Sequence, residues 1–562
     1  MRTCAAFIIL ALACTGGSDP EIQDNREFLS PTEHLVRASM ALRGIRPSLD
    51  ELDAVAEDPG YLPAIVDYYL TTDEFGVTIR ELHGESLLLG VAPDIYPAGF
   101  PTVGDLADRT SHEINLSVIE APLRLIEYVV MNDRPYHEIV TGEFTLADDI
   151  VATVWGLPYD EAEGGWQVTT YDDGRPVAGI LSDGFVFTRH ASTFSNKNRG
   201  RAAQIARGLL CYDFLDRQVE IDSGIDLADE EAVAFAIREN ATCVSCHQTL
   251  DPLASFFADH FPIRVPGEAE DYPLEQYAPE FAPLYRTARD RGYFGQSGVD
   301  LHDLGVRMAQ DSRFTMCAAR RFYAHFAQEE ERDIPLDLVS RFRDEFVASD
   351  MNARALARAI VLSDEFRVRR IAEDAAEDAA DDADVLVGLK RATPQQLERT
   401  IADLTGFTWR TSFLFDFGTG TIGEVDLMSD PFFGYRVLGG GTDSVSVTRP
   451  TRTASATTSL VHRELAGRAA QFVVQRDLNE PDPMFRRLLR EVDATTTDEA
   501  QIRAQLVQVH RRFFGETPLA DDPSVTAAWN VFDGTLRASG DPERAWTTTL
   551  FAMLQDIRIT YY

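Results

Sequence analysis

Apolar positions recur with a helical period through most of the chain, and polar capping signals mark where helices begin. Residues 30–33, Ser-Pro-Thr-Glu, form a capping box with proline at the first helical position, and the apolar stripe that follows stops at Gly44. Residues 48–51 and 393–396 repeat the device, and the latter stripe ends at Gly406. Because such residues satisfy the unpaired amides of a first helical turn, the pattern predicts helices directly after Ser30, Ser48 and Thr393.

Three segments share one order of features, at residues 35–79, 317–369 and 509–562. Each begins with an arginine-bearing helical stretch, continues through a loop with acidic residues, and ends with helices closed by an aspartate and an apolar residue. A helical hairpin cannot bury its apolar stripe alone, so the pattern predicts a mainly α fold of several helical modules. Independent helices with similar patterning remain the alternative. Residues 408–450 lack a helical period and are expected to form a loop-rich insert with short strands in the C-terminal half.

The length of 562 residues corresponds to several domains. Residues 371–384 contain seven acids and no base, which is typical of a solvated linker. The predicted organisation is a signal peptide at 1–14, a flexible tether at 15–29, an N-terminal helical domain at 30–160, a region bearing a Cys-x-x-Cys-His motif at 161–370, an acidic linker at 371–390 and a C-terminal helical domain at 391–562.

The first residues have the pattern of a bacterial lipoprotein signal. Arg2 precedes an apolar run that is too short to span a bilayer, and a small alanine comes directly before Cys14. The thiol of Cys14 would carry the lipid, and the protein would lie in the bacterial cell envelope, either lipid-anchored at the outer membrane or periplasmic. An ordinary cleaved signal is the alternative. On either interpretation, the only membrane contact expected is through the lipid anchor.

The chain is strongly acidic, with 91 acids against 52 bases and a net charge of −39. This charge excludes nucleic acid as a partner, since phosphate binding needs a basic surface. It favours a basic protein partner or a demand for solubility.

The chemistry-bearing pattern is Cys243-Val244-Ser245-Cys246-His247. Cys-x-x-Cys-His is the attachment pattern of c-type haem, in which two thiols form thioether bonds to the haem and the histidine becomes an axial iron ligand. The expected cofactor is therefore one covalent haem c, held by Cys243 and Cys246 and ligated by His247. A zinc site, a redox dithiol and a structural disulfide at this pair are the alternatives.

The sixth iron ligand is left open by the sequence. Met308, 61 residues after His247, is the first candidate. The rival candidates are Met316, His260, His302 and His190. An iron with no sixth ligand is a further alternative. A carbonyl near Asp251-Pro252 is expected to orient His247 through its other ring nitrogen. An apolar wall for the haem is expected from Phe256, Phe257 and Phe261.

Cys211 and Cys317 remain after these assignments. Outside the cytoplasm they can form a disulfide, and two buried free thiols are the alternative, because the sequence does not fix their distance.

Several segments resemble a family of large secreted cytochrome-c-like proteins of planctomycetes and myxobacteria, built from domains of unknown function. The resemblance is carried by residues 179–185, Asn198-Arg199-Gly200-Arg201, Leu209-Leu210-Cys211, residues 243–253 from the first motif cysteine through Asp-Pro-Leu, and more weakly residues 302–369 and 392–406. It covers about 60% of the chain. It departs from the family after Leu253, where Ala-Ser-Phe-Phe replaces the usual Gly-Phe. The resemblance implies haem and an extracytoplasmic location, and it implies no substrate.

The sequence thus predicts a cell-envelope, cytochrome-like lipoprotein that transfers electrons to or from a basic redox protein. The first alternative is a haem-dependent oxidoreductase of peroxidase type with an open iron site. The second is a surface-anchored binding or scaffold protein. Whether the chain is an enzyme stays open, and no catalytic residue is assigned.

Overall fold

The computed structural model describes residues 26–92, 100, 102–216, 224–226, 228–261, 271–371, 388–413, 423–431 and 433–562. The predicted signal peptide, Cys14, most of the tether and most of the acidic linker lie outside these residues.

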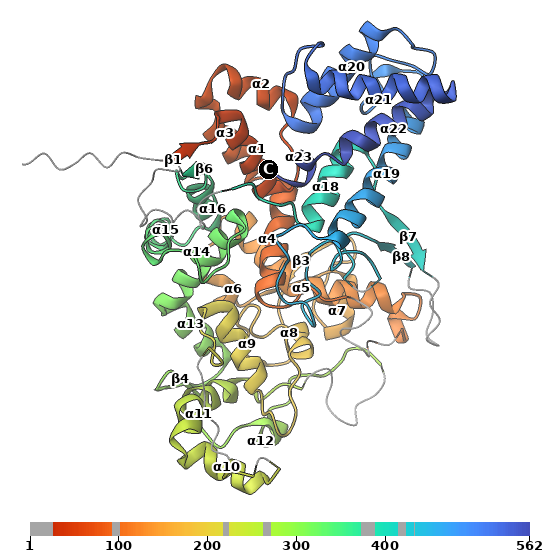
Figure 1. The fold of residues 1–562 in the computed structure, drawn as a ribbon. Helices are drawn as coiled ribbons and strands as arrows, with labels where there is room; N and C mark the ends of the chain where they lie inside the picture. Colours follow the sequence, from red (N-terminus) through yellow and green to blue (C-terminus); the bar gives the residue numbers. More distant parts are fainter. Residues whose placement is uncertain are drawn as a thin grey trace, which may run out of the picture.

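The described chain is mainly helical, as the apolar pattern predicts (Figure 1). The α-helices are α1 (Pro31–Arg43), α2 (Leu49–Glu57), α3 (Leu62–Tyr69), α4 (Asp73–Ser86), α5 (Ser111–Met131), α6 (Glu138–Thr141), α7 (Asp149–Trp155), α8 (Gly184–Arg189), α9 (Arg199–Leu210), α10 (Glu230–Glu239), α11 (Ala241–Ala254), α12 (Ala282–Tyr285), α13 (Leu301–Gln310), α14 (Ser312–Ala327), α15 (Leu336–Ala348), α16 (Ala353–Val361), α18 (Pro394–Thr405), α19 (Ala456–Asn479), α20 (Glu499–Phe514), α21 (Pro523–Ser539), α22 (Pro542–Leu554) and α23 (Ile557–Thr560).

Short strands pair as antiparallel ribbons of two. The pairs are β1 (Arg26–Phe28) with β6 (Val368–Ile371), β2 (Thr145–Ala147) with β3 (Gln167–Thr169), β4 (Gly292–Tyr293) with β5 (Gln296–Ser297), and β7 (Arg410–Phe413) with β8 (Gly423–Asp426). The β7–β8 ribbon lies in the insert that the sequence predicts to be loop-rich, and the described residues between β8 and α19 form turns and loops.

The three predicted capping boxes are confirmed. Ser30, Ser48 and Thr393 each accept a hydrogen bond from the backbone amide three residues later, and the Glu or Gln at that position bonds back to the cap amide. The helices α1 and α18 end at Gly44 and Gly406, which both have positive φ. These termini follow from contacts within one turn, which explains why the local sequence predicts them.

The three repeated segments adopt the same succession of helices. A first helix (α1, α14 or α20) is followed by a loop, a second helix (α2, α15 or α21) and a third (α3, α16 or α22). Each first helix ends at a residue in the left-handed conformation: Gly44, Gln328 or Gly515. The closing aspartate of each segment begins the next feature: Asp73 is the first residue of α4, Asp364 begins a turn, and Asp556 caps α23.

Two large apolar cores organise the molecule. One takes in buried residues from Leu35 to Phe366 and does not divide at residue 160, so the predicted domains at 30–160 and 161–370 share it. The other contains Met40 and buried residues from Ala392 to Tyr562. Figure 1 shows α20, α21 and α22 at one end of the molecule and α10 and α11 at the other.

Polar contacts between α1 and α18 join the two cores. Gln396 Nε2 donates to the carbonyl of Met40 at 3.0 Å, and Thr400 Oγ1 donates to that of Gly44 at 2.9 Å. The guanidinium of Arg399 pairs with Glu81 on α4 and also donates to the carbonyl of Arg43. Buried charges of this kind are costly unless they are paired, so these contacts fix how the cores meet.

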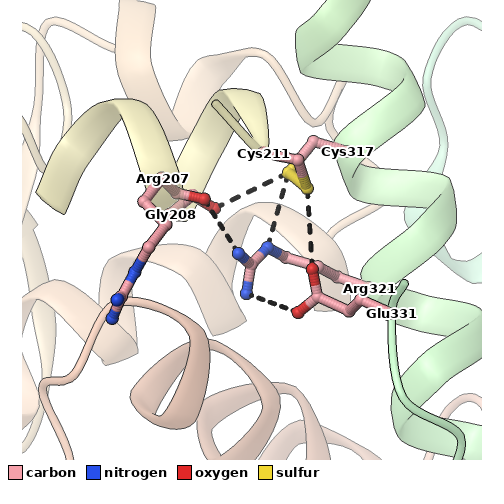
Figure 2. The surroundings of a disulfide bond; sticks show 6 residues. All are labelled: Arg207, Gly208, Cys211, Cys317, Arg321 and Glu331. Carbon is pink, nitrogen blue, oxygen red and sulfur yellow. Dashed lines mark hydrogen bonds and ion pairs between the residues drawn. A yellow bond between two sulfur atoms is a disulfide. The ribbon is translucent and has the colours of Figure 1, made fainter. Parts of the chain in front are cut away.

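Cys211 and Cys317 form a disulfide with a Cα–Cα distance of 5.3 Å, one of the two outcomes that the sequence leaves open (Figure 2). Cys211 caps the C-terminal end of α9, and Cys317 lies within α14. Arg321 Nε lies 3.4 Å from the Cys317 sulfur, and another of its nitrogens donates to the carbonyl of Arg207. The bond fastens the C-terminal end of α9 to the large core, and Arg199 is the residue at the N-terminal end of α9.

We expect the double variant Cys211→Ser/Cys317→Ser to lower the free energy of unfolding by about 2–4 kcal/mol, because the disulfide closes a long loop in the unfolded chain. The cysteines are 106 residues apart. Urea unfolding measures the change. A reductant should weaken the wild type to the same extent and leave the variant unaltered, and equal stability of the two proteins without reductant would contradict the prediction.

Burial and the neighbouring Asp426 carboxyl raise the pKa of Glu398 on α18 to about 10. The folded state therefore holds a proton that the unfolded state releases near its ordinary pKa of 4.5, so this group lowers stability as the pH rises between these values. Glu398→Gln should raise the free energy of unfolding at about pH 9 and change it little at about pH 4. Exposed Glu424→Gln is the control, and parallel stability profiles for Glu398→Gln and wild type would refute the assignment.

Candidate functional site

The Cys-x-x-Cys-His motif lies on α11, which packs against α10 as a helical hairpin. Asn240 caps α11 by accepting from the amides of Thr242 and Cys243, so the motif begins within the first turn. Cys243 and Cys246 are free thiols, and both are partly exposed. Residues three and four apart share a helix face, which places the thiols on one side of α11, with His247 four residues after the first of them.

His247 is held by a carboxylate. Its Nδ1 lies 2.8 Å from Oδ1 of Asp251, one helical turn further along α11. Arg199, the first residue of α9, grips the same carboxylate, with Nε 2.7 Å from Oδ1 and Nη2 2.9 Å from Oδ2. The Asp251 side chain is 2% exposed and that of His247 is 24% exposed, so a buried anion supports a histidine that reaches the surface.

The electrostatics of this group decide which ring nitrogen of His247 faces the carboxylate as a donor. Burial alone raises the pKa of the Asp251 carboxyl, but hydrogen bonds from Arg199 and His247 outweigh burial and hold this pKa below its ordinary value. An ionised carboxylate only accepts, so Nδ1 of His247 carries the proton that it donates. The lone pair of the neutral ring then lies on Nε2, the nitrogen available to a metal.

The expected carbonyl near Asp251-Pro252 is replaced by the Asp251 side chain. The backbone carbonyl of Asp251 instead accepts hydrogen bonds from the hydroxyls of Ser255 at 3.1 Å and Thr287 at 3.0 Å. The helix continues through Pro252 to Ala254, so His247 and Asp251 stay in register one turn apart. The sequence analysis does not predict that Asp251 supports His247 or that Arg199 pairs with Asp251. The spacing His-x-x-x-Asp is the signal that could have identified Asp251, because residues four apart share a helix face.

Apolar side chains are exposed on the segments beside the motif. The Cys246 sulfur lies 3.8 Å from the carbonyl of Phe214, and the next residue, Leu215, is 85% exposed. Phe235 on the neighbouring α10 is 61% exposed. These two side chains are exposed on segments that neighbour α11.

The three phenylalanines expected to form a haem wall are instead fully buried. Phe256 and Phe257 belong to the large core, and Phe261 packs in a small cluster with Tyr285. Their side chains pack in the interior in this structure, while Leu215 and Phe235 are exposed on segments that neighbour α11.

The methionines considered as sixth ligand pack against the large core. Met308 on α13 is 1% exposed, and Met316 on α14 is partly buried against the same core. Met308 is thus a buried core residue, and its role as sixth ligand stays a prediction.

The rival histidines lie on other segments and make contacts of their own. His190 Nε2 and His302 Nδ1 each lie 3.1 Å from a backbone carbonyl. His260 is 1% exposed, stacks on Phe187 with ring centroids 4.1 Å apart, and lies beyond the C-terminal end of α11. The structure therefore places Cys243, Cys246 and His247 together on α11, and the identity of a sixth ligand stays a prediction.

No family model, curated protein or solved structure matches this chain. Within the part of the chain that the structure describes, no helix combines the length and apolarity needed to cross a membrane. Nor do the described residues contain a group of three or more His, Cys, Asp or Glu side chains arranged to hold a metal ion. The functional argument therefore depends on the motif helix and its supporting contacts.

We expect haem-free protein produced without residues 1–14 to expose two reactive thiols, because Cys243 and Cys246 are free while Cys211 and Cys317 are bonded. Titration with a disulfide reagent under native conditions counts them. Cys243→Ser and Cys246→Ser should each remove one thiol. A count of zero in the unmodified protein would show a disulfide within the motif.

Proposed function

We propose that the protein is a cell-envelope c-type cytochrome that transfers single electrons through one covalent haem. The observation that carries the proposal is the arrangement on α11, where two free thiols and His247 share a helix and Asp251 leaves Nε2 of His247 with its lone pair. The family resemblance of the sequence supports the same cofactor and location.

The residues present fit a haem of this type. Cys243 and Cys246 would each add an S–H bond across a vinyl double bond, forming one C–S and one C–H bond with no leaving group. His247 would supply Nε2 as the axial ligand, and Asp251 would orient its ring. The exposed Leu215 and Phe235 would cover part of the macrocycle. The bound group would supply one-electron cycling between ferric and ferrous iron.

The surroundings suit exchange of electrons with another protein. The motif lies at one end of the molecule, away from α20–α22 (Figure 1), and its side chains are partly exposed. A net charge of −39 favours a basic redox partner and disfavours nucleic acid. One electron would enter from a reduced partner and leave to an oxidised one.

The location is part of the proposal. Cys14 would be lipidated, and residues 15–29 would tether the protein to the envelope membrane through that lipid alone. The Cys211–Cys317 disulfide is consistent with an oxidising compartment, which is also where c-type haem is attached.

A haem-dependent oxidoreductase is the second candidate. This candidate corresponds to an iron that Met308, which is 1% exposed within the large core, does not ligate. An iron with an open sixth position would bind a small ligand or peroxide. The absorption spectrum separates the candidates, because low-spin iron supports electron transfer, whereas high-spin iron that binds cyanide or CO supports catalysis.

We expect the full chain, produced with haem-maturation factors, to stain for haem on a denaturing gel. Cys243→Ala/Cys246→Ala should lose the stain because both thioether bonds are removed, and His247→Ala should alter the spectrum of any haem retained. Ser245→Ala, between the two cysteines, is the matched control and should stain like wild type. A wild type without stain, alongside a control cytochrome that stains, would refute the proposal.

A further inference from the structure

The two side chains that support His247 carry charges of opposite sign. Asp251 is an i,i+4 neighbour on the same helix, and Arg199 comes from α9, far away in sequence. The guanidinium contacts both carboxylate oxygens, at 2.7 and 2.9 Å, and one of these oxygens also meets Nδ1 of His247. The three side chains therefore form one chain of contacts, cation to anion to imidazole.

The supporting helices hold this chain in place. The α9 helix is fastened at its far end by the Cys211–Cys317 disulfide, and Arg199 stands at its first turn. The backbone of Asp251 is held by the hydroxyls of Ser255 and Thr287. Because the carboxylate is 2% exposed, water screens its interaction with the imidazole poorly.

We infer that Asp251 and Arg199 are positioning residues that set the reduction potential of an iron ligated by His247, with effects of opposite sign. The Asp251 anion draws on the Nδ1 proton, makes the ring a stronger donor and favours ferric iron, which lowers the potential. Arg199 shares the same carboxylate, weakens that effect and adds a positive charge, which raises the potential. This inference rests on the proposed haem function.

Two substitutions separate the contributions. Asp251→Asn keeps an amide oxygen as hydrogen-bond acceptor and removes the charge, so the equilibrium constant for one-electron reduction should rise about tenfold, which corresponds to about 59 mV. Arg199→Gln leaves the carboxylate to His247 alone, so that constant should fall about threefold or more. Arg199→Lys restores the charge and should return the potential toward the wild-type value.

Asp259→Asn is the matched control. Asp259 follows the C-terminal end of α11, is also largely buried, and pairs with Arg291. Its carboxylate is not part of the contact chain to His247. Its substitution should change the reduction constant less than twofold, which is the expectation for loss of an ion pair without contact to the axial ligand.

The experiment is a spectroelectrochemical titration of the haem-loaded full chain and these variants, with the haem stain recorded in parallel. Opposite shifts for Asp251→Asn and Arg199→Gln, with Asp259→Asn unchanged, support the inference. Equal or same-sign shifts overturn it while haem attachment stands. A wild type without haem overturns the proposed function and this inference together. If the Asp251→Asn variant does not acquire haem, the potentials of Arg199→Gln and Arg199→Lys test the inference, because both variants retain Asp251.

Discussion

The buried carboxylate of Asp251 is the constraint on which the packing of α9 against α11 depends. A charge with 2% of its surface exposed is unstable in a protein unless cations and donors surround it. Arg199 meets this need, which brings the start of α9 against α11, and His247 completes it, which fixes the tautomer of the ring. The orientation of the histidine is therefore a consequence of how the lobe folds, and it is established before any cofactor is considered.

What the sequence predicts well is local. The caps at Ser30, Ser48 and Thr393 involve residues within one turn, so short patterns suffice. The motif helix was not among these predictions, although its cap at Asn240 is also a contact within one turn. The pairing of Arg199 with Asp251 spans 52 residues, and the pairing of Cys211 with Cys317 spans 106, so neither distance follows from spacing.

The errors at the site have a common physical origin. The sequence predicts a carbonyl near Asp251-Pro252 as the partner of His247 and assigns no helix through Pro252. The helix instead runs through it to Ala254, which keeps the Asp251 side chain on the face of His247. Likewise Phe256 and Phe257 carry the right chemistry for a cofactor wall, yet the large core takes them. Burial decides such cases, and it depends on the whole fold.

The arrangement of charge extends this reasoning to the rest of the molecule. Many arginines are committed to internal contacts, such as Arg399 with Glu81 between the two cores and Arg37 with the carbonyls of Phe366 and Val368. Arg399 neutralises an acid inside the fold and Arg37 satisfies carbonyls, while the chain as a whole keeps its excess of acids. The acidity that would attract a basic partner and the arginine contacts that join the cores are thus two results of one composition.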